Sequence, residues 1–169
     1  LSEDTAMGKY LVESVRKMSN TAETTEAHLY YSNLQKVKKK QRKKYISRAV
    51  GLASVSTAEI LKASCLVVPT MTGYTARMIS SLRPNTPIYA ISPSEQAVRR
   101  MQIYWGVYAM PGETEDSTRH MITNSMKIIL RRKLIKKGEL AVFTAGDPAT
   151  NMVSGRGRST NVMQVVEAK

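Results

Sequence analysis

The sequence predicts an α/β fold in which a three-layer αβα sandwich surrounds a mostly parallel five-stranded sheet, with the last strand antiparallel. From residue 65 onward, short apolar runs alternate with segments of helical periodicity, which is typical of strand–helix–strand units. The first run, residues 65–69, is continuously apolar, as expected of a strand covered by helices on both faces. The last apolar segment follows a loop and not a helix, so we expect an antiparallel strand at or near an edge.

The expected elements follow from spacing and from residues typical of helix ends. Helices are predicted at residues 5–27, 46–63, 74–82, 94–103 and 116–135, and strands at 65–69, 87–92, 105–110, 139–146 and 160–168. Ser94 is expected to cap its helix, and Trp105 is expected to open a strand. Lys136 and Lys137 before Gly138 are typical of a helix C-terminus, where cations meet the negative end of the dipole.

Composition limits the class of protein. The 169 residues are 42% hydrophobic and include a single cysteine, Cys65, which gives no disulfide framework and favours a cytoplasmic location. No apolar run approaches the roughly 18 residues of a membrane span, and no signal peptide is evident, so no membrane partner is expected. The formal charge is +13, but residues 36–44 hold seven basic side chains and leave +6 for the remainder. Nucleic acid is therefore an unlikely partner, although a binder that uses residues 36–44 stays an alternative.

The segment PTMTGYT, residues 69–75, follows the first predicted strand of the sheet. Ligands of open α/β sheets bind beyond the carboxyl ends of the strands. Gly73 lets a ligand approach the backbone, and the hydroxyls of Thr70, Thr72 and Thr75 can donate to an anion beside the first amides of a helix. The sequence therefore predicts a phosphate site here. An ordinary strand–helix turn with a threonine cap is the alternative.

A second loop, residues 147–159, follows another strand and suits the same kind of ligand. It carries Arg156 and Arg158 around Gly157, and guanidinium groups bind phosphate through two parallel hydrogen bonds. Two such loops at one edge predict a ligand with one or two phosphates. A solvated loop is the alternative. The two histidines have no metal-ligand spacing, so no metal ligand and no catalytic residue is predicted.

Several segments together resemble pyruvate kinase. LSEDTAMGKYLVESV, residues 1–15, is similar to the stretch that closes the catalytic barrel of that family. VVPTMTGYTARMISSLRPNTPIYAISP, residues 67–93, resembles its C-terminal phosphate loop, with Thr72 where serine is common. WGVY, KKGELAVFTAG and STNVMQV follow in family order. The resemblance covers nearly the whole chain outside residues 28–45 and 111–120.

The resemblance implies a function for the parent protein and for this segment. Pyruvate kinases transfer phosphate from phosphoenolpyruvate to ADP in glycolysis, in a barrel that holds Mg²⁺ and K⁺. That barrel is missing here, so the segment should need no cofactor and should be inactive alone. The C-terminal domain of the family binds phosphorylated allosteric effectors, and tetramers are usual. The expected partners are therefore an effector, the missing barrel and further copies of the chain.

Three parts are expected along the chain. Residues 1–29 are assigned to the barrel-closing stretch and its helix, residues 30–45 to a basic linker, and residues 46–169 to the C-terminal α/β domain. The effector site is predicted at Thr70, Thr72, Gly73 and Thr75, with Arg156, Gly157 and Arg158 as its second part. A stand-alone phosphate-binding module is the remaining alternative, and the barrel-closing residues argue against it.

Overall fold

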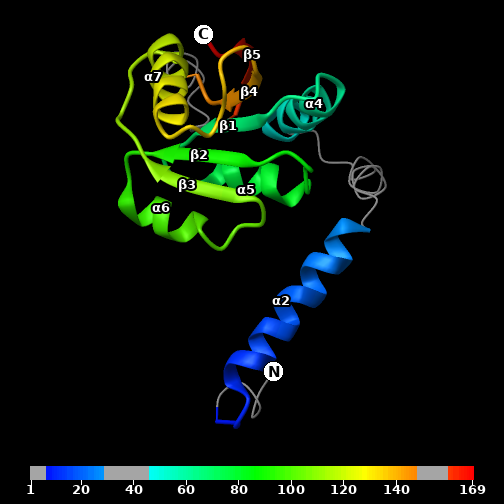
Figure 1. The fold of residues 1–169 in the computed structure, drawn as a ribbon. Helices are drawn as coiled ribbons and strands as arrows, with labels where there is room; N and C mark the ends of the chain where they lie inside the picture. Colours follow the sequence, from blue (N-terminus) through cyan, green and yellow to red (C-terminus); the bar gives the residue numbers. More distant parts are fainter. Residues whose placement is uncertain (1–6, 29–45, 148–159) are drawn as a thin grey trace. The chain divides into compact units, whose positions relative to one another are not determined.

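The computed structural model describes residues 7–28, 46–147 and 160–169. The chain forms two compact units, Leu1–Asn33 and Leu34–Lys169 (Figure 1). The predicted division at residues 29/30 and 45/46 stays a prediction, because residues 29–45, including the basic run, lie outside the described part.

The first unit contains one described helix, α2 (Leu11–Ala27). It begins later than the predicted residue 5. Its apolar side chains Leu11, Val15 and Met18 fall on one stripe, and all three are exposed. The hydroxyls of Thr21 and Thr25 donate to main-chain carbonyls one turn earlier. Within the described residues, this apolar stripe is uncovered.

The second unit contains the alternating elements that the sequence predicts. In chain order they are α4 (Ile46–Ile60), β1 (Cys65–Pro69), α5 (Tyr74–Ser81), β2 (Ile88–Ser92), α6 (Glu95–Met101), β3 (Val107–Pro111), α7 (Thr118–Arg131), β4 (Leu140–Ala145) and β5 (Val162–Glu167). The Ser94 hydroxyl accepts a hydrogen bond from the Ala97 N–H at 3.3 Å, so its predicted role as N-cap of α6 is confirmed.

The strands form one sheet in the order β3-β2-β1-β4-β5. The pairs β1–β2, β1–β4 and β2–β3 are parallel, and β4–β5 is antiparallel, with Ala141 opposite Val166. The mostly parallel sheet with an antiparallel last strand is therefore confirmed. Because β1 lies at the centre, the loop that follows it opens in the middle of the carboxyl edge.

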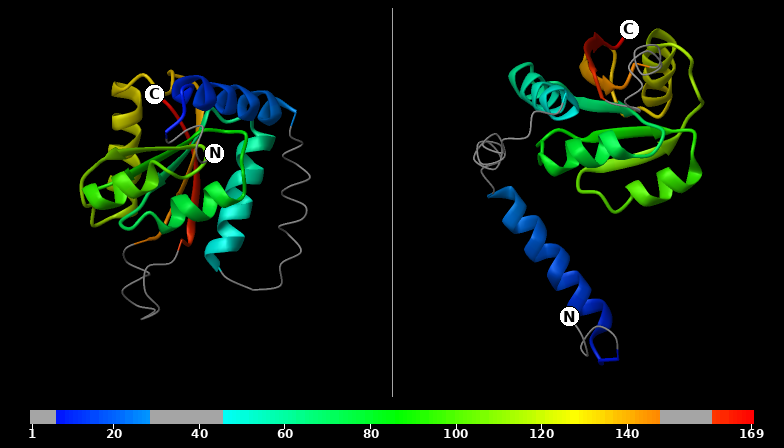
Figure 2. Two further views of the ribbon diagram at one scale, coloured as in Figure 1. Left: turned by 90° about the horizontal axis from the view of Figure 1, so that it is seen from below. Right: turned by 180° about the vertical axis from the view of Figure 1, so that it is seen from behind.

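Helices cover both faces of the sheet, which makes the three layers (Figure 2). On one face, α4, α5 and α6 pack against Leu66, Val68 and Ile88. On the other face, α7 packs against Val67 and Phe143. Alternate residues of β1, β2 and β4 thus enter two separate cores, which is why these three strands are almost continuously apolar.

The start of β3 and the end of α7 differ from the prediction because of backbone turns. Trp105 was expected to open β3, but Gly106 adopts φ +67° and the strand begins at Val107. The Trp105 carbonyl accepts a hydrogen bond from the Ser80 hydroxyl at 2.7 Å, which fixes this turn against α5. The last described helix was expected to reach residue 135, but it ends at Arg131 because Lys133 adopts φ +56°.

Candidate functional site

The loop between β1 and α5 is held by hydrogen bonds from its own residues and from β2. The Thr70 N–H donates to the Ile91 carbonyl at 2.9 Å, which continues the β1–β2 ladder to the sheet edge. The Thr70 hydroxyl oxygen then accepts a hydrogen bond from the Gly73 N–H at 3.1 Å. The Ser92 hydroxyl, at the end of β2, donates to the Met71 carbonyl at 3.3 Å. Thr70 therefore shapes the loop and is not directed outward.

Gly73 is the N-cap of α5 and has φ +82°, a conformation that favours glycine. It supplies no side-chain cap. Among the described residues, no acceptor is recorded for the N–H groups of Tyr74, Thr75 and Ala76. A helix N-terminus with unpaired amides and a positive dipole end attracts an anion.

The three threonines of the loop take different positions. Thr72 is exposed at the start of the helix. Thr75 is buried, 7% exposed, and its hydroxyl lies 2.8 Å from the hydroxyl of Thr160. Thr75 therefore offers a main-chain N–H to the helix start while its side chain points into the protein. Of the three threonines, only Thr72 has a hydroxyl that is both exposed and without a partner among the described residues.

The two ends of the 147–159 loop are joined to each other. The Asp147 N–H donates to the Asn161 side-chain oxygen at 2.7 Å, and the Asn161 N–H donates to the Ala145 carbonyl at 3.0 Å. The predicted residues Arg156, Gly157 and Arg158 lie between these ends, outside the described residues. Their part in the site stays a prediction.

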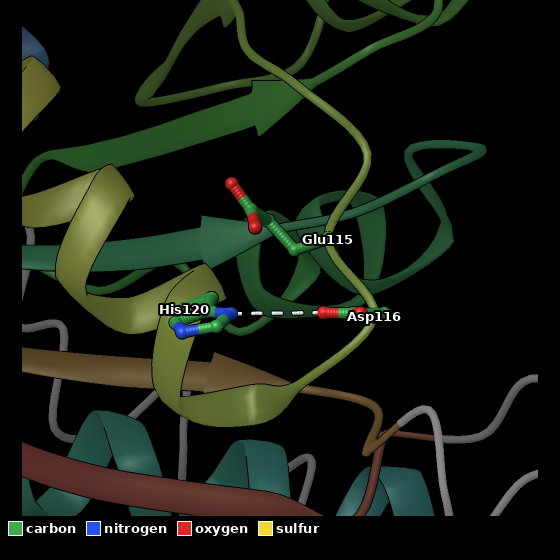
Figure 3. A group of neighbouring side chains, drawn as sticks. All are labelled: Glu115, Asp116 and His120. Carbon is green, nitrogen blue, oxygen red and sulfur yellow. Dashed lines mark ion pairs between the residues drawn. The ribbon is translucent and has the colours of Figure 1, made fainter.

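The group of Glu115, Asp116 and His120 holds three possible metal-ligand atoms within 4.8 Å of one another, near the start of α7 (Figure 3). The His120 Nδ1 lies 3.7 Å from Asp116 Oδ1, and both side chains are largely exposed. The Glu115 carboxylate accepts a hydrogen bond from Asn124 at 2.5 Å. These side chains pair with each other or with Asn124, and water reaches two of them, so we assign no metal site here.

Two titratable groups lie in the core beneath the site. Burial, with a smaller contribution from the Glu139 carboxylate, raises the pKa of the Cys65 thiol from 9.0 to about 12. Burial also raises the pKa of Tyr89, with smaller contributions from Cys65 and Tyr108. A thiol that stays protonated is a poor nucleophile, so Cys65 is a core residue, as its place in an apolar strand predicts.

Among the described helices, none is long and apolar enough to cross a membrane.

The family model described as "Pyruvate kinase, alpha/beta domain" matches residues 48–166. The chain belongs to the pyruvate kinase family. The predicted resemblance is confirmed, and the match covers the whole sheet from β1 to β4 and nearly all of β5.

Curated relatives extend the similarity to the first unit. The chain is 33% identical over 165 residues to a pyruvate kinase of Sporosarcina psychrophila and 35% identical to one of Clostridium acetobutylicum. These alignments cover 98% of this chain but only 27% and 34% of the relatives. The chain therefore spans about a third or less of the pyruvate kinases that it matches.

Solved structures support the same fold. A crystal structure of a pyruvate kinase from Cryptosporidium parvum superimposes with a TM-score of 0.82 at 24% identity, over all of this chain and 32% of that one. A structure of the pyruvate kinase from the same organism in complex with ADP gives a TM-score of 0.76, also at 24% identity.

Sequence reasoning did not find three residues that hold the candidate site in place, because they lie outside the loop of residues 69–75. Thr160 and Asn161 hold the loop ends, and Met101 of α6 packs against Gly73, where a Cβ would lie 2.9 Å from Met101 Cγ. Thr160 lies 85 residues from its partner Thr75 and 113 residues from its partner Ser47. Local patterns do not carry such pairings.

Proposed function

We propose that this chain is the C-terminal regulatory part of a pyruvate kinase and that it binds a phosphorylated small-molecule effector at the start of α5. The observation that carries this proposal is the start of α5, where the N–H groups of Tyr74 and Thr75 have no acceptor within the described residues and lie next to the exposed Thr72 hydroxyl. Because Ala76 is fully buried, a phosphate there would meet three donors, the Thr72 hydroxyl and the N–H groups of Tyr74 and Thr75, together with the positive end of the helix dipole. The parent reaction would convert phosphoenolpyruvate and ADP into pyruvate and ATP in glycolysis.

Each residue of the loop takes a separate role in this proposal. Thr72 donates its hydroxyl to the phosphate, and Thr70 holds the loop through the Gly73 N–H. Gly73 adopts the left-handed turn from which α5 starts. Thr75 contributes its N–H, while its hydroxyl stays on Thr160. Arg156 or Arg158 would supply a second anchor from the 147–159 loop.

Other partners are proposed from exposed apolar surface. The α2 stripe of Leu11, Val15 and Met18 would pack on the catalytic barrel of the parent protein, which would hold Mg²⁺ and K⁺. In the second unit, β5 is an edge strand whose Met163 and Val165 are exposed, as a contact between copies of the chain requires. A tetramer in the cytoplasm is the expected assembly.

The effector proposal is tested by calorimetry with fructose 1,6-bisphosphate, glucose 6-phosphate, ribose 5-phosphate and AMP. Removing the hydroxyl in Thr72→Val should weaken binding about tenfold, because a hydrogen bond to a charged group contributes roughly 1.5–3 kcal/mol. Thr123→Val, at an exposed threonine on α7, is the matched control and should leave affinity unchanged. If none of the four ligands binds below millimolar concentration, or if Thr72→Val has no effect on a ligand that binds, the site is wrong.

A further inference from the structure

We propose that Thr160 and Asn161 form a hub that couples the N-termini of α4, α5 and α7. Through this hub, occupancy of the start of α5 would change the other two helix starts. The effect of occupancy at α5 rests on the proposed function. The coupling between the three helix starts does not require a ligand. Thr160 and Asn161 are positioning residues in this proposal and do not touch the effector.

Thr160 joins α5 to α4. Its hydroxyl lies 2.8 Å from the hydroxyl of Thr75, in the first turn of α5. Its N–H donates to the hydroxyl of Ser47, in the first turn of α4, at 3.0 Å. All three residues are buried, with 1% of Thr160 exposed. Buried polar groups that lose their partners destabilise a protein strongly, so these helix starts are held in one arrangement with the loop end.

Asn161 extends the connection to α7 through Asp147. The Asp147 N–H donates to the Asn161 side-chain oxygen at 2.7 Å. The Thr118 hydroxyl, in the first turn of α7, donates to the Asp147 carboxylate at 2.8 Å. The Asn161 N–H is fixed in turn by the Ala145 carbonyl at the end of β4. Hydrogen bonds therefore run from α5 to α7 through residues 160, 161 and 147.

The coupling is informative because α5 and α7 cover opposite faces of the sheet. No hydrogen bond joins Thr75 directly to Thr118 in the described structure. An anion that bonds to the first amides of α5 would shift the first turn, which includes Thr75. Since the Thr75 hydroxyl is held by Thr160, the shift would reach Ser47 on one side and Asp147 on the other.

A double-mutant cycle tests the hub without any ligand. Thr75→Val and Thr118→Val each remove one hydroxyl, and the unfolding constants of both single variants and the double variant are measured in urea. Substitutions at distant, independent sites combine almost additively. The hub predicts a departure from additivity of at least fivefold in the unfolding constant, which should disappear when the cycle is repeated with Asn161→Ala.

The cycle of Thr75→Val with Thr123→Val is the matched control, because Thr123 lies on α7 but outside the connection. This cycle should be additive within about twofold. If Thr75→Val does not fold, Thr75→Ala at low denaturant or Ser47→Ala takes its place in the cycle with Thr118. Additive effects of Thr75 and Thr118 would overturn the hub.

A second measurement follows hydrogen exchange at residues 46–50 and 117–121 with and without fructose 1,6-bisphosphate. We expect the ligand to change exchange by more than threefold in both segments of the unsubstituted chain and in neither segment of Asn161→Ala. Binding without any change at these segments would overturn the transmission. Failure of all phosphorylated ligands to bind would instead overturn the proposed function, and the ligand-free cycle would still decide the hub.

Discussion

Thr144 and Thr75 are both buried threonines near the carboxyl edge of the sheet, but only Thr75 has a hydrogen-bond partner. In the described residues, the Thr144 hydroxyl is the one buried side-chain oxygen or nitrogen without a partner. Thr144→Val replaces that hydroxyl by a methyl group of similar size and should raise the free energy of unfolding by about 1 kcal/mol. Thr75→Val should lower it by about 1–2 kcal/mol, because it leaves Thr160 without its partner.

Urea unfolding at constant m-value measures both changes. Both variants replace a threonine hydroxyl by a methyl group. If both raise or both lower the free energy of unfolding, the hydrogen bond of Thr75 does not decide the outcome.

Gly73 and Gly138 separate two costs of adding a side chain. Both have positive φ, +82° and +84°, so alanine costs about 1–2 kcal/mol of backbone strain at either position. A Cβ at Gly138 meets nothing within 4 Å, whereas at Gly73 it lies 2.9 Å from Cγ of Met101, which is fully buried. Gly73→Ala should therefore destabilise the fold by about 1 kcal/mol more than Gly138→Ala. Thermal and urea unfolding measure the two losses of stability. Equal losses would contradict the prediction and would mean that the Met101 side chain moves away from the new Cβ at little cost.

The raised pKa of Cys65 makes stability depend on alkaline pH. In the unfolded chain the thiol ionises above its pKa of 9.0, whereas in the folded chain it stays protonated up to about pH 12. The unfolded state therefore binds fewer protons in this window, and stability falls as pH rises. Between pH 8 and pH 10 the chain should lose about 1.4 kcal/mol more than Cys65→Ala, which lacks the thiol. Parallel stability curves for the two proteins would contradict the buried-thiol account.

At the scale of elements, three of the described helices, α4, α5 and α7, end in the same unusual way. The positive-φ residues other than glycine in the described chain are Lys62, Arg83 and Lys133, which follow α4, α5 and α7. A cation complements the negative end of a helix, but the left-handed conformation favours glycine. At these positions the strain of the left-handed backbone destabilises the fold, while the positive charge at the helix end stabilises it.

Lys133→Gly tests this balance. Glycine should relieve the strain at φ +56° and raise stability by about 0.5–1 kcal/mol, even though one cation is lost. Arg131→Gly, two residues earlier and still inside α7, should lower stability by about 1 kcal/mol instead. Chemical denaturation of both variants decides the matter, and a loss of stability in Lys133→Gly would mean that its charge dominates its strain.

The sequence predicted the elements of the second unit because each depends on local patterns. The continuous apolar runs of β1 and β4 and the spacing in α5 and α7 are visible within ten to fifteen residues. The turn at Gly106 that excludes Trp105 from β3 depends on Ser80 and Arg83, more than twenty residues earlier. Likewise, threonines and a glycine predicted the position of the candidate site, but not that the Thr75 hydroxyl would face Thr160.

At the scale of the whole molecule, size decides what the described chain can catalyse. A barrel of eight strands and eight helices needs roughly 250 residues, more than the 169 present here. The second unit is instead one sheet covered on both faces, and its carboxyl edge carries hydroxyls and amides without any described cluster of nucleophile and base. Within the described residues this edge therefore lacks a base that would activate a hydroxyl for phosphoryl transfer.

We therefore expect this 169-residue chain to form no pyruvate from phosphoenolpyruvate and ADP in the presence of Mg²⁺ and K⁺. A coupled lactate dehydrogenase assay measures the rate, and a mock preparation from host cells without the chain, purified in parallel, controls for host enzyme. A Thr72→Val preparation is assayed beside them. The preparations of the chain and of Thr72→Val should still differ in effector affinity, which would separate binding from catalysis in one set of samples. Turnover that co-purifies with the chain through several columns would mean that phosphoryl transfer does not need the barrel.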